Sequence, residues 1–370
     1  MDYSFARGLS SNLTKTYSCS YNTAMRKWIA IFGITIICLL LPAIWATNLL
    51  YEAPPKAFTA SAPWTVIKPD NTAVEVPAGW NEGSLGNPSY QKGIYAVSMR
   101  IPVGQSGTNP KQKYVLVFPM TNGTGIRVYI NGMFVGEMGD MQNGNANIWH
   151  RIKIFSIPPD VLRDDNEILA ELYGAYGAGV PRTPFILPVE RNKLRLFFMG
   201  FLSNWLLWFV SGASFMMGAI LILIGSSSFP RLDARFILGL ASLLTALFLS
   251  DFMFLEYLPI PLVEFKRLTV LFRHGAACLF LPGYLALLER KNGIFSRIFC
   301  ASQLICIIAL FLPRDMITLK AFYSITYLSV IPLPLYLTWI IFRHSLTRID
   351  HLVLLVGAFT ASVLSLIDSF

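Results

Sequence analysis

The long apolar runs of this chain, and the polar stretch after the first of them, most constrain its fold. Trp28–Leu50 is almost free of charge and long enough to cross about 30 Å of hydrocarbon. From Glu52 to Arg195 no such run occurs. Six further runs follow, Phe201–Gly225, Phe236–Leu255, Leu268–Leu288, Ile298–Leu312, Ala321–Ile341 and Leu352–Phe370. The sequence therefore predicts a transmembrane anchor over 28–50, a polar domain, and an all-α transmembrane bundle of about six helices over 196–370.

The distribution of lysine and arginine predicts the orientation of these helices. The tail 1–27 is basic, and so are alternate loops after the polar domain. Because cytoplasmic loops carry an excess of Lys and Arg, we expect the tail 1–27 in the cytoplasm and residues 52–195 outside it. The net charge of +9 is then a topology signal, which argues against nucleic acid as a partner and leaves membrane lipid.

A cleaved signal peptide is the alternative interpretation of the first apolar run. Its apolar core is longer than the 7–15 residues or so of a signal peptide. The segment "PAIWATNLL" offers no convincing cleavage site, although Ala43 and Ala46 keep that alternative open. The five cysteines all lie outside 52–195, so we expect no disulfide in the polar domain. Their spacing resembles no metal site, and neither a metal nor a cofactor is expected.

Short strand-like segments recur through the polar domain. They are Gly93–Ile101, Lys113–Pro119, Gly125–Ile130, Met133–Gly136, Ile148–Ile157, Glu167–Gly174 and Thr183–Leu187. Turn signals rich in Gly, Pro and Asn separate them, and Asn131-Gly132 is typical of a tight hairpin turn. We therefore expect residues 52–190 to form an extracytoplasmic β-sandwich of the jelly-roll type, placed between the anchor and the bundle.

Three stretches of this domain carry a resemblance to a known family. "GIYAVSMRIPV", "YVLVFPMTNGTGIRVYINGMFVGEMG" and "WHRIKIFSIPPDVLRDDNEILAELYG" resemble the galactose-binding-like jelly roll of glycosidase accessory domains and periplasmic sensor domains. The positions that match its pattern are Asn131, Gly132, Gly136, Pro158, Leu162 and Asn166. This resemblance implies the fold and, more loosely, a carbohydrate ligand.

The order of an external sandwich followed by many spans resembles the bacterial seven-transmembrane receptors with diverse intracellular signalling modules. That resemblance implies a multi-pass protein of the bacterial cytoplasmic membrane, a homodimer as a further partner, and a histidine kinase or diguanylate cyclase as output. Six predicted spans follow the domain and the sequence stops at "LSLIDSF". We therefore expect the last span and the effector to lie beyond this chain. A complete seven-span protein is the alternative.

No catalytic motif is found, so we expect no enzyme activity in these residues and look for a binding site instead. Trp149 and Arg151 lie on one face of the strand predicted over Ile148–Ile157. An aromatic ring can stack on a sugar while a guanidinium donates hydrogen bonds. The alternative is that Trp149 fills the core and Arg151 tethers a loop. Further ligand candidates follow the last long strand, namely Tyr173, Tyr176 and Arg182.

Two groups of charged residues are candidates for signal coupling. The linker Pro188–Phe198 carries Arg191, Lys193 and Arg195, and we expect it to dock on the acidic residues Asp251, Glu256 and Glu264. Ionisable residues inside spans are costly and are therefore functional candidates, here Asp251, Arg273, His274 and Asp368. The alternative is that these four lie hydrated at the membrane interface. A signal receptor is the favoured function, and a transporter or permease component with an external accessory domain is the alternative.

Overall fold

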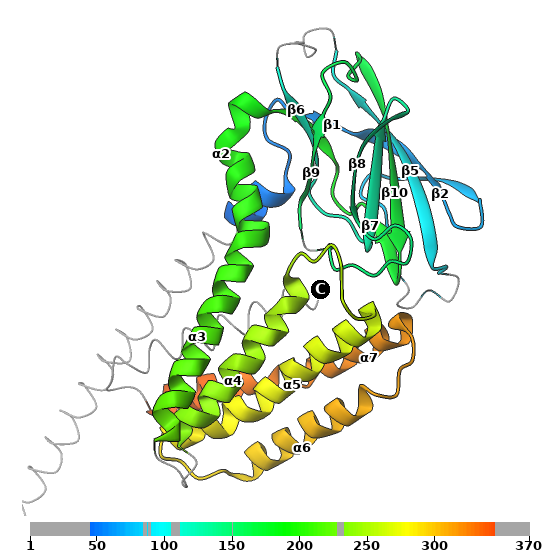
Figure 1. The fold of residues 1–370 in the computed structure, drawn as a ribbon. Coiled ribbons are helices and arrows are strands. Elements are labelled where there is room, and N and C mark those ends of the chain that lie inside the picture. Colours follow the sequence, from blue (N-terminus) through cyan, green and yellow to red (C-terminus); the bar gives the residue numbers. More distant parts are fainter. Residues whose placement is uncertain are drawn as a thin grey trace, which may run out of the picture. The chain divides into compact units, whose positions relative to one another are not determined.

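The computed structural model describes residues 45–83, 87, 90–104, 112–149, 151–227 and 233–344. One compact unit, 46–330, contains all the described strands and the helices α2 to α7 (Figure 1). The helix α8 (Pro332–His344) belongs to a second unit. The predicted anchor over 28–50 lies mostly outside the described residues, of which 45–51 are helical.

A β-sandwich occupies the first part of the larger unit. One sheet has the strand order β1-β12-β6-β9, a second has β3-β2-β5-β10-β7-β8, and β11 pairs with β4. The strands are β1 (Phe58–Thr59), β2 (Ser61–Ile67), β3 (Ala73–Val76), β4 (Asn81–Gly83), β5 (Gly93–Pro102), β6 (Tyr114–Phe118), β7 (Gly125–Ile130), β8 (Met133–Gly139), β9 (Lys153–Ile157), β10 (Asp165–Gly174), β11 (Gly177–Gly179) and β12 (Phe185–Pro188). The predicted sandwich is present, with five strands (β1 to β4 and β11) that the sequence patterns did not reveal.

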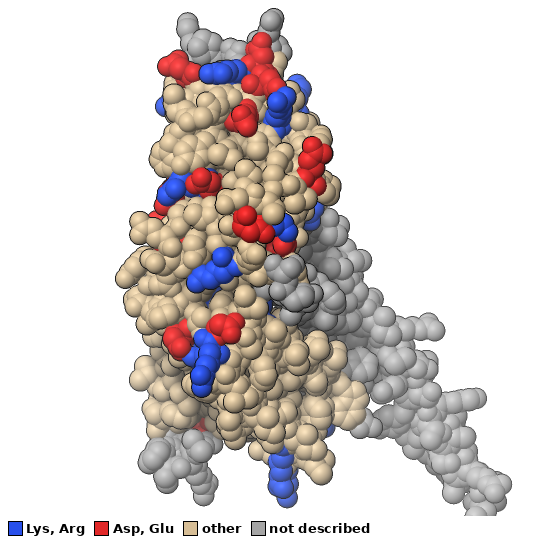
Figure 2. All heavy atoms as spheres, turned by 90° about the vertical axis from the view of Figure 1, so that its right-hand side faces the viewer, with Lys and Arg blue, Asp and Glu red and all other residues tan. Residues whose placement is uncertain are grey.

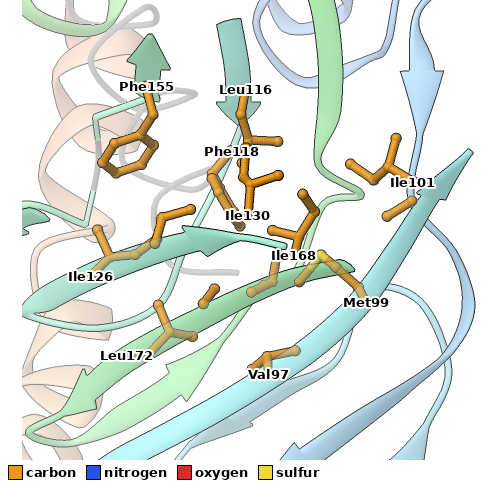
Figure 3. Close-up of a cluster of buried hydrophobic side chains, with 14 of the residues drawn as sticks. Val97, Met99, Ile101, Leu116, Phe118, Ile126, Ile130, Phe155, Ile168 and Leu172 are labelled. Atoms are coloured by element: carbon orange, nitrogen blue, oxygen red, sulfur yellow. The ribbon is translucent and has the colours of Figure 1, made fainter. Parts of the chain in front are cut away.

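The two main sheets enclose an apolar core. Alternate residues of β5, from Tyr95 to Ile101, are buried, as the two-residue period of a strand requires. Figure 3 shows side chains from both sheets, among them Val97, Leu116 and Ile168, pointing toward one another. Burying apolar surface of this kind is the main stabilising contribution to such a domain.

The hairpin turn between β7 and β8 confirms the prediction made for Asn131-Gly132. Both residues have positive φ, at 51° and 80°, as a type I′ turn requires. The Asn131 amide donates to the Asn166 side chain at 3.0 Å and to the Val161 carbonyl at 2.8 Å. Asn166 is fully buried and also donates to the Ile101 carbonyl. These hydrogen bonds join the hairpin to the corner before β10.

The helical part follows the sandwich directly. The helices are α2 (Val189–Gly200), the π-helical turn η1 (Phe201–Trp205), α3 (Leu206–Ser226), α4 (Ala234–Phe248), the 3-10 turn η2 (Leu249–Phe252), α5 (Leu262–Leu287), α6 (Ile294–Ala309) and α7 (Met316–Leu328). The linker expected over Pro188–Phe198 consists almost entirely of helix α2, which continues through η1 into α3.

Four helical segments are long and apolar enough to cross a membrane. They are Val189–Ser226, Ala234–Phe252, Leu262–Leu287 and Met316–Leu337. The run expected to be the shortest span corresponds to α6, which has 16 residues. In Figure 2, charged side chains of both signs gather over the sandwich, while much of the helical surface on that face is uncharged. This chain is thus a β-sandwich joined to helices of membrane-spanning character, and the run over 352–370 lies outside the described residues.

Candidate functional site

Residues 140–149, which follow β8, form the loop through which the sandwich contacts the helical part, and we call this loop the docking loop. Its conformation is set by Asp140, whose carboxylate accepts from the backbone N–H groups of Gln142 at 2.9 Å, Asn143 at 3.0 Å and Asn145 at 2.9 Å. Burial raises the pKa of Asp140, but these three donors outweigh burial and hold the pKa below its ordinary value. The carboxylate therefore holds the loop in one shape.

The docking loop pairs with the α4–α5 loop, residues 249–261. Asn147 and Leu255 exchange two backbone hydrogen bonds, of 2.8 and 2.9 Å, in an isolated antiparallel bridge. The Asn147 amide also donates to the carbonyls of Asp251 at 2.8 Å and Met253 at 2.9 Å. Nearby, the Asn145 amide donates to the Leu258 carbonyl at 3.1 Å. A single loop of the sandwich thus forms a specific polar contact with the helical part.

A buried lysine of α5, Lys266, donates hydrogen bonds to both sides of this contact. The Lys266 ammonium donates to the Asp251 carboxylate at 2.7 Å and to the Asn147 side-chain oxygen at 3.0 Å. Thr269 donates to the same carboxylate at 3.2 Å. Lys266 is 1% exposed, so its charge depends on these partners for compensation. The network joins the sandwich, the α4–α5 loop and α5.

Two aromatic rings complete the contact. Trp149 and Tyr176 meet edge to face, with ring centroids 5.4 Å apart. The Lys266 ammonium lies 4.4 Å from the centre of the Trp149 ring, and Lys320 of α7 lies 4.6 Å from that of Tyr176. Burial raises the pKa of Tyr176 well above its ordinary value. We call the following set the docking interface: Asn147, Trp149, Tyr176, Asp251, Lys266 and Lys320.

The predicted ligand residues are placed differently from expectation. The strand predicted over Ile148–Ile157 begins only at Lys153, so the inference that Trp149 and Arg151 share one face of a strand is wrong. The physical reason is that the backbone of the preceding Asn147 pairs with Leu255 of the α4–α5 loop and not with a strand of the sheet. Arg151 lies 4.1 Å above the Phe254 ring of that loop. Both residues therefore contact the helical part.

The remaining ligand candidates are not gathered at one site. Tyr173 packs against the same apolar cluster as Trp149, and Lys92 lies 6.0 Å from its ring centre. Arg182 is exposed and lies 5.9 Å from the Tyr51 ring. Tyr176 is only 3% exposed, which leaves its ring little surface for a sugar. The structure thus brings Trp149, Tyr173 and Tyr176 together as packing residues, and a ligand role for these residues stays a prediction.

The basic residues of α2 do not dock on the acidic residues of the α4–α5 region, and that expectation is wrong. Lys193 pairs with Glu190 at 2.5 Å, one helical turn away. Arg195 donates to the carbonyls of residues 48, 49 and 52. Arg191 and Glu256 are exposed, and Glu264 pairs with Arg267 at 2.5 Å. Local partners thus satisfy Lys193, Arg195 and Glu264, whereas Arg191 and Glu256 are exposed to solvent.

Arg273 and His274 lie inside the helical part and not at a hydrated interface. His274 is fully buried, and its Nδ1 lies 2.7 Å from the Gln303 side-chain oxygen. Gln303 in turn donates to the Ser329 carbonyl at 3.1 Å. The Arg273 guanidinium lies 4.2 Å from the centre of the Tyr327 ring. These side chains form a buried polar cluster that joins α5, α6 and α7, whereas Asp368 lies outside the described residues.

Sequence reasoning missed Asn147, Lys153, Lys266 and Lys320. Each of the two helical lysines lies just before a predicted apolar run, where a lysine is expected at the membrane boundary. A signal was nevertheless present in Lys266, which is followed at helical spacing by Thr269 and Arg273. Such a polar stripe on an otherwise apolar helix indicates a buried polar contact.

No family model matches the chain, and no curated protein matches it. Among solved structures it is similar to a β-D-mannosidase from Dictyoglomus thermophilum (13% identity, 36% of this chain and 22% of that chain, TM-score 0.29). Others are a β-glucuronidase from Ruminococcus gnavus (10%, 38% and 31%, 0.29) and one from Bacteroides uniformis (17%, 35% and 17%, 0.28). The chain spans less than a third of the length of each. Likeness at these TM-scores carries no conclusion about activity.

Proposed function

We propose that this chain is the sensing part of an integral membrane signal receptor. In this proposal the β-sandwich binds a small ligand outside the cytoplasm, and the docking interface passes the change to the membrane helices. A cytoplasmic histidine kinase or diguanylate cyclase is the output that the resemblance to seven-transmembrane receptors implies. Carbohydrate is the ligand class that the resemblance to galactose-binding-like jelly rolls implies.

One observation carries the proposal, namely that the sandwich contacts the helices through a built polar interface as well as through the covalent chain. An accessory domain that takes no part in signalling needs only its covalent connection to the helices. Here a buried ammonium, Lys266, is compensated jointly by Asp251 of the helical part and Asn147 of the sandwich. Breaking one partner of such a network leaves a buried charge without compensation. A small change in the sandwich that moves Asn147 therefore alters the balance of forces on α5.

Coupling of this kind requires an element that both sites bias. The docking loop meets this requirement, because the Asp140 backbone N–H donates to the Thr124 carbonyl of the sandwich at 3.1 Å, while Asn147 pairs with Leu255. From Lys266, the buried side chains Thr269 and Arg273 continue along α5 toward the cluster with Gln303. A displacement at the interface thus has a contiguous polar route into the helices.

A transporter is the second candidate, and the buried cluster in the helices favours it. Ionisable side chains inside spans mark substrate and ion pathways as well as signalling elements. Arg273 and His274 lie within a candidate span, and Pro282 lies farther along the same helix. Proline within a transmembrane helix often accompanies a break near a transport site. Uptake into vesicles separates this function from sensing.

The test uses the full chain in lipid nanodiscs with a panel of galactose, mannose, glucuronic acid and short β-linked oligosaccharides. Calorimetry measures binding, and amide hydrogen exchange measures the response of the α4–α5 loop and α5. If the chain is a receptor, we expect a bound sugar to change amide hydrogen exchange in the α4–α5 loop and in α5. The matched variant Asn147→Ala should retain sugar affinity and lose the change in α5.

Three results would contradict parts of this proposal. A sugar that binds and leaves exchange beyond Val189 unchanged contradicts coupling. Sugar accumulation by vesicles containing the chain, abolished by Arg273→Met, supports the transporter instead. Failure of every sugar in the panel to bind contradicts carbohydrate as the ligand class.

A further inference from the structure

A second buried lysine, Lys153, lies within the sandwich beside the docking loop. It is the first residue of β9. Strand alternation places it on the inward face of β9 together with Phe155 and Ile157, which both belong to the sandwich core. Its side chain is fully buried. Among the described residues its hydrogen-bond acceptor is the Trp149 carbonyl, 3.3 Å from Nζ. An amine in this position has one neutral acceptor and an apolar surrounding.

Among the described residues, the strands that pack against β9 place no buried acidic side chain beside Lys153. Strand β6, which pairs with β9, has the sequence YVLVF, and Lys153 lies opposite Phe118. On β8, which also packs against β9, the single charged residue is Glu137, which is exposed and pairs with Arg127. On the preceding segment the charged residue is Arg151, a cation. A charge on Lys153 is therefore opposed by burial and by its nearest charged neighbour.

An amine so placed loses its proton far more readily than a lysine in water. Burial lowers the pKa of Lys153 from its ordinary value of 10.5 to about 7, and the Arg151 guanidinium contributes in the same direction. The side chain consequently changes charge close to neutral pH. Ordinary surface lysines do not, because their pKa lies near 10.4.

The position of Lys153 links its charge to the docking interface. Its acceptor carbonyl belongs to Trp149, whose ring faces Tyr176 and the ammonium of Lys266. The cation that it repels, Arg151, stacks on Phe254 of the α4–α5 loop. Both helix-contacting residues of the segment 149–153 thus respond to a proton on Lys153, one through a hydrogen bond and one through repulsion.

We propose that Lys153 is a proton-controlled latch, which lets Trp149 and Arg151 dock on the helical part while its amine is neutral and loosens that docking when the ammonium forms. Among the described residues, the charged groups that face these two side chains from the helices are Asp251, Glu256, Lys266 and Lys320. Of these, Asp251 and Lys266 compensate each other. The latch requires only the docking interface, and it is independent of any ligand or output.

Docking is measured by the distance between spin labels on the full chain in lipid nanodiscs. Labels at the exposed positions Met133 of the β7–β8 hairpin and Tyr257 of the α4–α5 loop report domain orientation. The five native cysteines are first replaced by alanine, and the unlabelled variant is checked for folding. Spectra are recorded between about pH 6 and about pH 8.5. Loosening should broaden the distance distribution as pH falls.

The expected result is a ratio of docked to undocked molecules that falls by up to about tenfold per pH unit below neutrality. In Lys153→Met, which keeps the length and removes the charge, the narrow distribution should persist at every pH. Lys153→Gln, which retains a donor for the Trp149 carbonyl, should behave like Lys153→Met. The matched control Lys113→Met, which removes an exposed lysine of the sandwich outside the docking interface, should keep the wild-type pH dependence.

Two results would overturn the latch. One is a wild-type distribution that does not change over this pH range, and the other is a pH dependence that survives in both Lys153 variants. If both variants fail to fold, ¹⁵N NMR of the Lys153 amine in the wild-type chain decides the matter. Titration near neutrality together with broadening supports the latch, whereas an amine that stays charged up to about pH 9 refutes it.

Discussion

The interior of the sandwich and the docking interface each bury one lysine, and they treat its charge in different ways. Lys153 is 0% exposed and Lys266 is 1% exposed. Lys266 donates to the Asp251 carboxylate at 2.7 Å and to Asn147, whereas Lys153 reaches one carbonyl at 3.3 Å. Equal burial thus leaves one amine paired with a carboxylate and the other without one.

This difference shows that burial by itself does not determine the role of a lysine. A buried ion pair is costly to form and costly to break, which suits a contact that must be made in one geometry. A buried amine without a carboxylate exchanges its proton near neutral pH, which suits a contact that changes with conditions. Lys266 contacts the ring of Trp149 and Lys153 donates to its carbonyl, so under our proposal the same contact has a permanent part and a titratable part.

The largest effect is expected for Asp251→Ala, which leaves the Lys266 ammonium without its carboxylate. Loss of one partner of a buried pair costs about 3 to 5 kcal/mol. We expect this loss in the local stability of the interface, measured by hydrogen exchange at the amides of Asn147 and Leu255. The double variant Asp251→Ala with Lys266→Met should recover part of it. Equal losses in the single and double variants would show that the pair is not what compensates Lys266.

A smaller loss is expected for Asn147→Ala, which removes three side-chain hydrogen bonds, one of them from Lys266. An unsatisfied buried group costs about 1 to 3 kcal/mol, and more when it is charged. We expect about 2 to 3 kcal/mol in the same exchange measurement. The matched variant Asn145→Ala removes one hydrogen bond to Leu258 and should cost about 1 kcal/mol. A larger loss for Asn145→Ala than for Asn147→Ala would contradict the inference that Asn147 makes the main polar contact of the docking loop.

Lys153→Met should change how the stability of the full chain depends on pH. The folded-state pKa of Lys153 is about 7, below the ordinary 10.5, so the unfolded chain binds the extra proton between these values. Wild-type stability therefore rises with pH in this window and becomes flat below about pH 7. From about pH 7 to about pH 9 we expect a gain of about 2 kcal/mol over Lys153→Met, measured by thermal unfolding. Parallel pH profiles would show that Lys153 stays protonated.

The smallest effect is expected for Arg191→Glu combined with Lys193→Glu on α2. Arg191 is exposed, and the ion pair of Lys193 with Glu190 is also exposed. Exposed pairs contribute about 0 to 1 kcal/mol, so hydrogen exchange at Asn147 should scarcely change. A loss as large as that of Asp251→Ala would restore the linker as a docking element. Such a loss would also show that the exposed charges of α2 stabilise the interface as much as the buried Lys266–Asp251 pair does.

The sequence by itself determined the elements whose physical cause is local. The hairpin at Asn131-Gly132 follows from two residues that accept positive φ, and both have it. The strands of the sandwich core follow from a two-residue alternation, and β5 and β10 match their predicted positions closely. The apolar helices follow from run length, because backbone groups in a membrane need internal hydrogen bonds. Each of these signals lies within a few neighbouring residues.

Only the tertiary structure decided which polar residues meet. Asn147 bonds to Lys266 across 119 positions of sequence and to Asp251 across 104. A local sequence pattern cannot reveal a contact between residues that are more than 100 positions apart. The sequence therefore allowed partners for the charged residues to be inferred only from their predicted side of the membrane. The strand prediction for Trp149 fails for the same reason, since alternation says nothing about the bridge from the neighbouring Asn147 to Leu255 of the α4–α5 loop. Lys153 looks like any polar residue of the strand predicted over Ile148–Ile157 until its burial is known, and burial is a property of the packed domain.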